Sequence, residues 1–130
     1  MGFEDFANPH SLQDIIEAIG ATPINFSRQQ DCCGFHAVYP AHDSVMQMTG
    51  SINKDAVDEG ADCLVTPCPL CQMQLDMFQE EAKSTVPCKA DMPILHLSQL
   101  LGLALGVTPQ EMGMPRRHLT TTKALEKFLA

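Results

Sequence analysis

Tryptophan is absent from this chain, tyrosine occurs once, and only eight basic residues stand against sixteen acidic ones. The net charge of −8 argues against a nucleic-acid partner, because phosphate binding needs clustered lysine and arginine, and Arg116-Arg117 is the only basic pair. No apolar run approaches the roughly 20 residues of a transmembrane segment, and the acidic start lacks the apolar stretch of a secretory signal. We therefore expect a cytoplasmic protein that docks to other proteins.

Composition and length favour one globular domain. Hydrophobic residues make up 45% and charged residues 18% of the 130 residues, a balance that argues against disorder. The chain is long enough to bury one core and too short for two, so residues 1–130 are expected to form a single domain. Six cysteines without a secretory signal indicate a reducing compartment, where clustered thiols bind metal or carry out redox chemistry.

The spacing of apolar residues predicts alternating strands and helices. Strands are expected at residues 23–27, 62–67 and 93–97. Helices are expected at residues 8–20, 41–59, 68–82, from the N-cap Ser98 to 105, and 120–130. This alternation implies an α/β fold, a small parallel sheet flanked by helices in a Rossmann-like arrangement.

Two cysteine pairs follow expected strands. Cys32 and Cys33 come after the first of them, and Cys68 and Cys71 come directly after the second. In open parallel sheets the binding crevice lies beyond the carboxyl ends of the strands. The pattern therefore predicts one shared site at this edge, built from four thiolates.

The Cys68-Pro-Leu-Cys71 pair lies at the expected start of a helix. Two thiols three residues apart in a first turn point the same way, and the N–H groups and dipole of the helix N-terminus favour a thiolate. Pro69 suits this turn because its missing N–H is not needed there. The alternative is that both are ordinary buried cysteines.

The adjacent pair Cys32-Cys33 favours a multi-iron cluster. Neighbouring thiols diverge along the backbone, so they are awkward ligands for one tetrahedral zinc ion but can reach different irons. Gly34 would let the loop backbone approach a bulky inorganic group.

The remaining cysteines and histidines give weaker signals. Cys63 is expected in the core, and Cys88 in an exposed connection. His36 could donate a hydrogen bond to a sulfur or deliver a proton, or it is a loop histidine without a catalytic role, and Tyr39 has the same two interpretations. The other histidines show no ligand spacing to one another: His10, His42, His96 and His118.

The order Cys32-Cys33-Gly34 followed by Cys68-Pro-Leu-Cys71 resembles the cysteine-rich CCG domain. That domain occurs in the B subunit of heterodisulfide reductase and in related succinate, glycolate and lactate oxidoreductase subunits. Further segments that resemble the heterodisulfide reductase branch are residues 7–12, 60–62, 75–76 and 99–106.

The resemblance implies a non-cubane [4Fe-4S] cluster. Its metal ligands and catalytic residues would be Cys32, Cys33, Cys68 and Cys71, with one further cysteine upstream and Gly34 beside the cluster. The implied chemistry is cleavage of a disulfide, or electron relay to another small-molecule acceptor, with electrons from partner iron–sulfur or flavin subunits.

One feature departs from that family. Its members carry two such domains in tandem, and this sequence resembles the second, yet no cysteine precedes Cys32. We therefore expect a C-terminal fragment that is inactive by itself and holds zinc, a damaged cluster or no metal. The alternatives are a structural zinc-binding interaction module with four thiolate ligands and a thiol exchanger using Cys68 and Cys71, which leaves Cys32 and Cys33 without a role.

Overall fold

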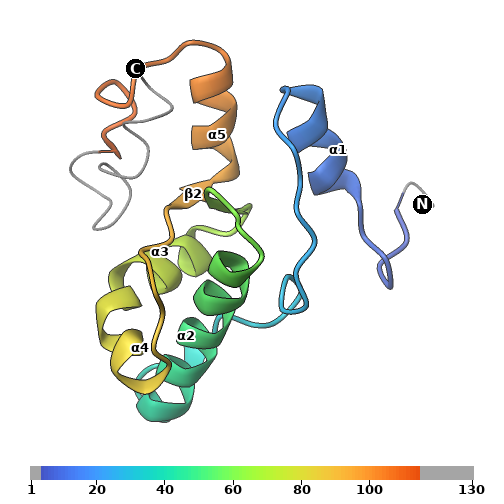
Figure 1. Ribbon diagram of the computed structural model, residues 1–130. Helices are drawn as coiled ribbons and strands as arrows, with labels where there is room; N and C mark the ends of the chain where they lie inside the picture. Colours follow the sequence, from blue (N-terminus) through green and yellow to red (C-terminus); the bar gives the residue numbers. More distant parts are fainter. Residues whose placement is uncertain (1–3, 115–130) are drawn as a thin grey trace.

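The computed structural model describes residues 4–114, which contain five α-helices, one 3-10 helix and two strands. In chain order these are α1 (Ser11–Ala18), η1 (Phe35–Ala37), α2 (His42–Asp58), β1 (Leu64–Thr66), α3 (Pro69–Met77), α4 (Gln79–Thr85), β2 (Ile94–His96) and α5 (Leu97–Ala104). Helices α2, α3 and α4 lie together in one group (Figure 1). Helix α5 follows β2 and extends away from this group, and α1 lies to one side.

The two strands form a parallel sheet. Leu64 pairs with Ile94, and Thr66 pairs with His96, so both strands end at the same edge. Helices α3 and α4 provide the crossover that a parallel pair requires. Because Ile94 and Leu95 are at most 1% exposed, β2 is buried on both faces, as is typical of parallel strands. The expected strands at 62–67 and 93–97, and the small parallel sheet, are confirmed.

The strand expected at residues 23–27 is wrong. These residues have no ladder partner in the described part of the chain, and Ile24 is 41% exposed. Pro23 has no N–H to donate to a ladder. Alternating polarity indicates that a segment can pair but not that a partner strand lies beside it. With two strands among residues 4–114, the Rossmann-like arrangement stays a prediction.

Helix predictions succeed in the interior of the chain and fail at boundaries. The expected helix 41–59 is confirmed as α2. The helix expected at 8–20 is shorter in the structure, where α1 spans Ser11–Ala18 and has no buried residue. The expected helix 68–82 is divided at Phe78 into α3 and α4. His96, not Ser98, is the N-cap of α5, because its side chain accepts a hydrogen bond from the N–H of Ser98. The expected helix 120–130 lies outside the described residues.

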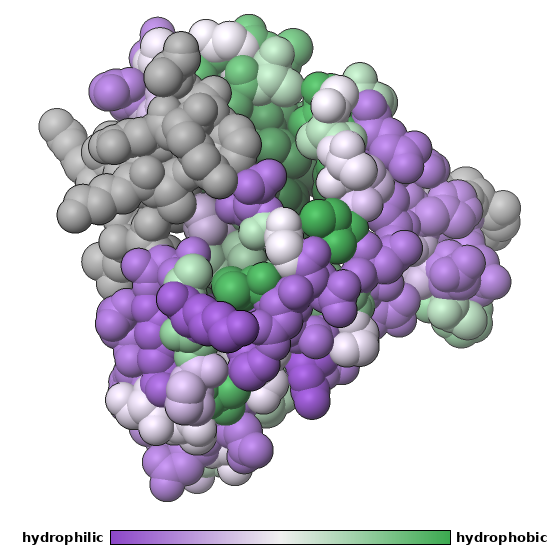
Figure 2. All heavy atoms as spheres, viewed as in Figure 1, coloured by the Kyte–Doolittle hydropathy of each residue, from purple (hydrophilic) through white to green (hydrophobic). Residues whose placement is uncertain are grey.

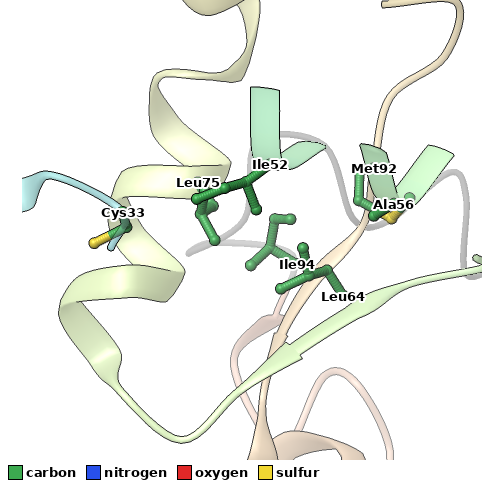
Figure 3. Packing of buried hydrophobic residues seen from close by; sticks show 7 residues of the cluster. All are labelled: Cys33, Ile52, Ala56, Leu64, Leu75, Met92 and Ile94. Carbon is green, nitrogen blue, oxygen red and sulfur yellow. The ribbon is translucent and has the colours of Figure 1, made fainter. Parts of the chain in front are cut away.

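The main hydrophobic core joins both strands to α2, α3 and the cysteine loop. Figure 3 shows its seven buried residues: Cys33, Ile52, Ala56, Leu64, Leu75, Met92 and Ile94. Figure 2 shows hydrophobic residues also gathering on the surface near α5, where Leu105 is 83% exposed. One of the candidate ligands, Cys33, is therefore a member of the core.

A buried glutamine lies directly after the break between α3 and α4. Gln79 is 2% exposed. Its Nε2 donates to the carbonyl of Met92 at 2.9 Å, and its Oε1 accepts from the N–H of Met92 at 2.5 Å. The amide thus pairs with one backbone residue as a strand neighbour would, and it holds the segment that leads into β2.

We predict that Gln79→Ala lowers the free energy of unfolding by about 1–3 kcal/mol, because it removes the two hydrogen bonds that the amide makes to the buried backbone of Met92. Gln47→Ala, at an exposed position of α2, is the matched control and should change it by less than about 0.5 kcal/mol. Urea denaturation followed by circular dichroism measures both. Equal losses would contradict this role of Gln79.

Candidate thiol site

The Cys68-x-x-Cys71 pair lies where β1 passes into α3. Cys68 is the N-cap of α3 in an extended conformation, and Pro69 occupies the first turn. Hydrogen bonds from the backbone N–H groups of Cys71 and Leu70 lower the pKa of the Cys68 thiol. The expected placement of this pair after a strand and at a helix start is confirmed, and the helix N-terminus favours a thiolate at Cys68.

Cys71 shows the opposite tendency. Burial raises its pKa to about 12, and hydrogen bonding with Cys33 and then with Cys68 acts in the same direction. Since the Cys68–Cys71 hydrogen bond lowers the pKa of one thiol and raises that of the other, Cys68 ionises first and Cys71 retains its proton. The structure thus brings three of the four candidate thiols into contact.

Cys33 connects these thiols to the core. It is 6% exposed and packs in the main hydrophobic cluster, with the half-buried Cys71 against the same cluster. Its sulfur turns away from Ile52 and Ile94 (Figure 3). The packing of an apolar cluster therefore determines where one of the three contacting thiols lies.

Cys32 is arranged differently. It is exposed, and its Sγ accepts a hydrogen bond from the N–H of Gly34 at 3.4 Å, within its own loop. Within residues 4–114, no group of three or more Cys, His, Asp or Glu side chains is arranged to hold a metal ion. The four-cysteine ligand set stays a prediction, with three members in contact and the fourth one peptide bond from Cys33.

Gly34 has a conformational role that the sequence alone does not reveal. Its φ is +81°, and a Cβ built there would lie 3.1 Å from both methyl groups of Val45 and 3.2 Å from the sulfur of Met48. The absence of a side chain thus allows the loop to approach α2. The predicted approach to an inorganic group is a separate matter that this packing does not test.

The other candidates have different surroundings from the three contacting thiols. His36 is exposed and makes an edge-on contact with the ring of Phe35, and Tyr39 is 95% exposed. Cys63 packs against a cluster of Leu95 and Met114, as expected of a core residue, and burial raises its pKa. Cys88 was expected to be exposed but is half-buried, because its thiol turns inward to donate to the carbonyl of Ala90 at 3.3 Å.

His96 is a residue that spacing arguments overlooked. Its Nε2 lies 3.0 Å from the carbonyl oxygen of Pro67, next to Cys68 in the chain. A criterion based on distance along the sequence could not find this contact. The available signal was its position near the end of an expected strand, because parallel strands end at the same edge.

A cysteine-rich domain family, CCG, matches residues 4–76. The chain is 50% identical over 123 residues to the 8-methylmenaquinol:fumarate reductase membrane anchor subunit of Wolinella succinogenes, covering 95% of this chain and 43% of that protein. It is 31% identical over 122 residues to the B subunit of the ferredoxin/F420H2-dependent CoB-CoM heterodisulfide reductase of Methanosarcina acetivorans, covering 92% and 41%.

A third relative is an Archaeoglobus profundus protein that is named as similar to the B subunit of heterodisulfide reductase. It is 32% identical over 114 residues, covering 84% of this chain and 37% of that protein. The chain thus spans less than half the length of these relatives. Although the Wolinella relative is named a membrane anchor, no helix within residues 4–114 has the length and apolar character to cross a membrane.

In the reduced, metal-free chain, iodoacetamide at mildly alkaline pH should alkylate Cys68 at least about tenfold faster than Cys71, because the thiolate is the reactive form. The sign follows from the lowered pKa of Cys68 and the raised pKa of Cys71. Peptide mapping by mass spectrometry measures the rates. Cys63, whose pKa is also raised, is the slow control, and equal rates for Cys68 and Cys71 would contradict the assignment.

Replacing Gly34 by alanine should destabilise the chain more than the same change at Gly60. Both glycines have positive φ, and nothing lies within 4 Å of a Cβ at Gly60. The left-handed conformation costs about 1–2 kcal/mol in each variant, and overpacking against Val45 adds about 1–3 kcal/mol at Gly34. Thermal unfolding of both variants tests this, and an equal effect would argue against tight packing there.

Proposed function

Because the chain belongs to the cysteine-rich CCG domain family, we propose that it is the iron–sulfur domain of an oxidoreductase subunit similar to the B subunit of heterodisulfide reductase. The observation that carries this proposal is the hydrogen bonding of Cys33 with Cys71, which in turn interacts with Cys68 at the start of α3. These thiols are distant in sequence and meet beside the end of β1. Their convergence is what a cluster bound by both cysteine pairs requires.

The residues present fit an iron–sulfur cluster by their chemistry. Thiolates are the ligands that such clusters use, and Cys33, Cys68 and Cys71 already lie in contact. Cys32 is exposed, so no packing opposes a change of its side-chain rotamer. We propose that these four residues hold a non-cubane [4Fe-4S] cluster, which when bound would accept and return electrons.

The protein contributes dipoles and a shaped surface to this site. The N–H groups of Leu70 and Cys71 stabilise negative charge on the Cys68 sulfur. The core holds Cys33 with little exposure, which lowers the local dielectric constant on one side of the thiols. Cys32 is exposed, so a substrate or a partner subunit can approach the site at this residue.

The names of the relatives support a role within a larger redox complex, since they are subunits of a fumarate reductase and of heterodisulfide reductases. We propose that electrons arrive from other iron–sulfur or flavin subunits. The acceptor would be a disulfide or another small molecule. Cleavage of such a disulfide would take up two electrons, which a bound cluster would supply, and would release both substrate sulfurs as thiolates.

A structural zinc module is the second candidate, favoured by the four-thiol donor set. The adjacent pair Cys32-Cys33 distinguishes the zinc module from the iron–sulfur cluster. Cys32 and Cys33 point to different surroundings, one exposed and one buried. Neighbouring ligands that diverge suit a cluster of several metal ions better than a single tetrahedral ion.

Anaerobic reconstitution with iron and sulfide tests the proposal. Excess free thiol is included to occupy any coordination position that this chain lacks. We expect bound iron and acid-labile sulfide, with an electron paramagnetic resonance signal after oxidation or reduction. Cys33→Ser and Cys71→Ser should lose most of the iron, because both thiols belong to the contacting set.

Cys63→Ser and Cys88→Ser are matched controls that should retain the iron, since neither residue belongs to the set of three contacting thiols. Stoichiometric zinc without an iron signal would replace the cluster with the zinc module. Disulfide exchange that survives the double change Cys32→Ser and Cys33→Ser would instead support a thiol exchanger that uses Cys68 and Cys71.

A further inference from the structure

The peptide that joins Pro67 to Cys68 is held at both of its polar atoms. The N–H of Cys68 donates to Thr66 Oγ1 at 3.2 Å. The carbonyl oxygen of Pro67 lies 3.0 Å from His96 Nε2. Thr66 and His96 are partners in the parallel ladder, so the last residues of both strands converge on one peptide group.

The hydrogen bonds of His96 define which ring nitrogen carries the proton. The carbonyl oxygen of Pro67 can only accept, so Nε2 carries a proton and donates to it at 3.0 Å. In the neutral ring Nδ1 is then the acceptor, and it takes hydrogen bonds from the Ser98 N–H at 3.3 Å and the Ser98 hydroxyl at 2.9 Å as the N-cap of α5. One imidazole thus caps α5 and restrains the turn that carries Cys68 at the same time.

A second link supports the same geometry from the other end of the cysteine pair. The N–H of His96 donates to Gln99 Oε1 at 2.9 Å, and Gln72 Nε2 donates to that oxygen at 3.3 Å. Gln72 follows Cys71 in α3. The start of α5 is thus bonded to both sides of the Cys68–Cys71 turn.

We propose that His96 is a positioning residue for the thiol site, acting with Thr66 to hold the Pro67–Cys68 peptide and so to aim the Cys68 sulfur at Cys71. The consequence for an iron–sulfur cluster rests on the proposed function, whereas the positioning of Cys68 does not. A free turn at this point would let the N-cap thiol rotate away from its neighbours.

Two conservative variants separate the two roles of the imidazole. His96→Asn places an amide oxygen near the position of Nδ1 and keeps the N-cap, since Asn is a favoured cap, but it cannot reach Pro67. His96→Gln places an amide N–H near the position of Nε2 and keeps a donor for Pro67, while the short cap is lost. Thr66→Val removes the acceptor for the Cys68 N–H at nearly constant volume.

The readouts begin with the reduced, metal-free full chain. Ring ¹⁵N shifts at mildly alkaline pH should show His96 protonated at Nε2, and amide exchange at Cys68 should be about fivefold faster in His96→Asn, the effect of one hydrogen bond. Titration with Co²⁺, followed through its thiolate absorption bands, should show about fivefold weaker binding for His96→Asn and Thr66→Val. His96→Gln should restore wild-type behaviour in both assays.

Several results would overturn the proposal: a proton on Nδ1, unchanged Cys68 exchange in His96→Asn, or equal losses in the Asn and Gln variants. The ring shifts need no variant, so a folding defect cannot hide the answer. Failure of iron to bind while these readouts hold would reject the proposed function and keep the positioning role. If wild type and His96→Asn load the cluster equally and amide exchange at Cys68 is unchanged, the positioning role is rejected and the proposed function is kept.

Discussion

The parallel pairing of β1 with β2 is the constraint on which the described structure depends. Each strand has only three residues, so the ladder alone supplies few hydrogen bonds. Burial stabilises it instead: Ile94 is fully buried against the main core, and Leu95 packs in a separate cluster on the other side. Because the strands end together, this short pairing brings Thr66 and His96 side by side and places the turn with Cys68 at a defined edge.

Buried polar side chains then fix the orientation of α3. Gln74 Nε2 donates to Thr49 Oγ1, and Asn53 Nδ2 donates to the carbonyl of Leu75, both at 3.0 Å between α2 and α3. Directional bonds in a buried interface specify one rotation of a helix, which apolar contact alone does less strictly. That rotation turns Cys71 toward Cys33, so residues remote from sulfur contribute to the geometry of the thiols.

The same elements explain the unequal environments of the cysteines. Cys33 belongs to the core, Cys71 is half-buried beside it, and Cys68 lies at a helix N-terminus. Burial favours the protonated thiol and backbone N–H groups favour the thiolate, so one small region contains thiols with raised and lowered pKa values. Cys68 is therefore the thiol that ionises more readily, and it lies beside Cys71, which holds its proton more tightly.

Local patterns in the sequence determined the elements that depend on local forces. Helical periodicity identified α2, apolar runs identified β1 and β2, and the proline after Cys68 marked the start of α3. The motif around Cys32 and Cys68 also indicated the family, because the spacing of thiols is a local property. Tertiary structure alone decided three features: residues 23–27 have no ladder partner among residues 4–114, the helix breaks at Phe78, and His96 contacts Pro67. Each of these depends on whether a partner from a distant part of the chain is present, and the order of residues along one segment carries no information about that.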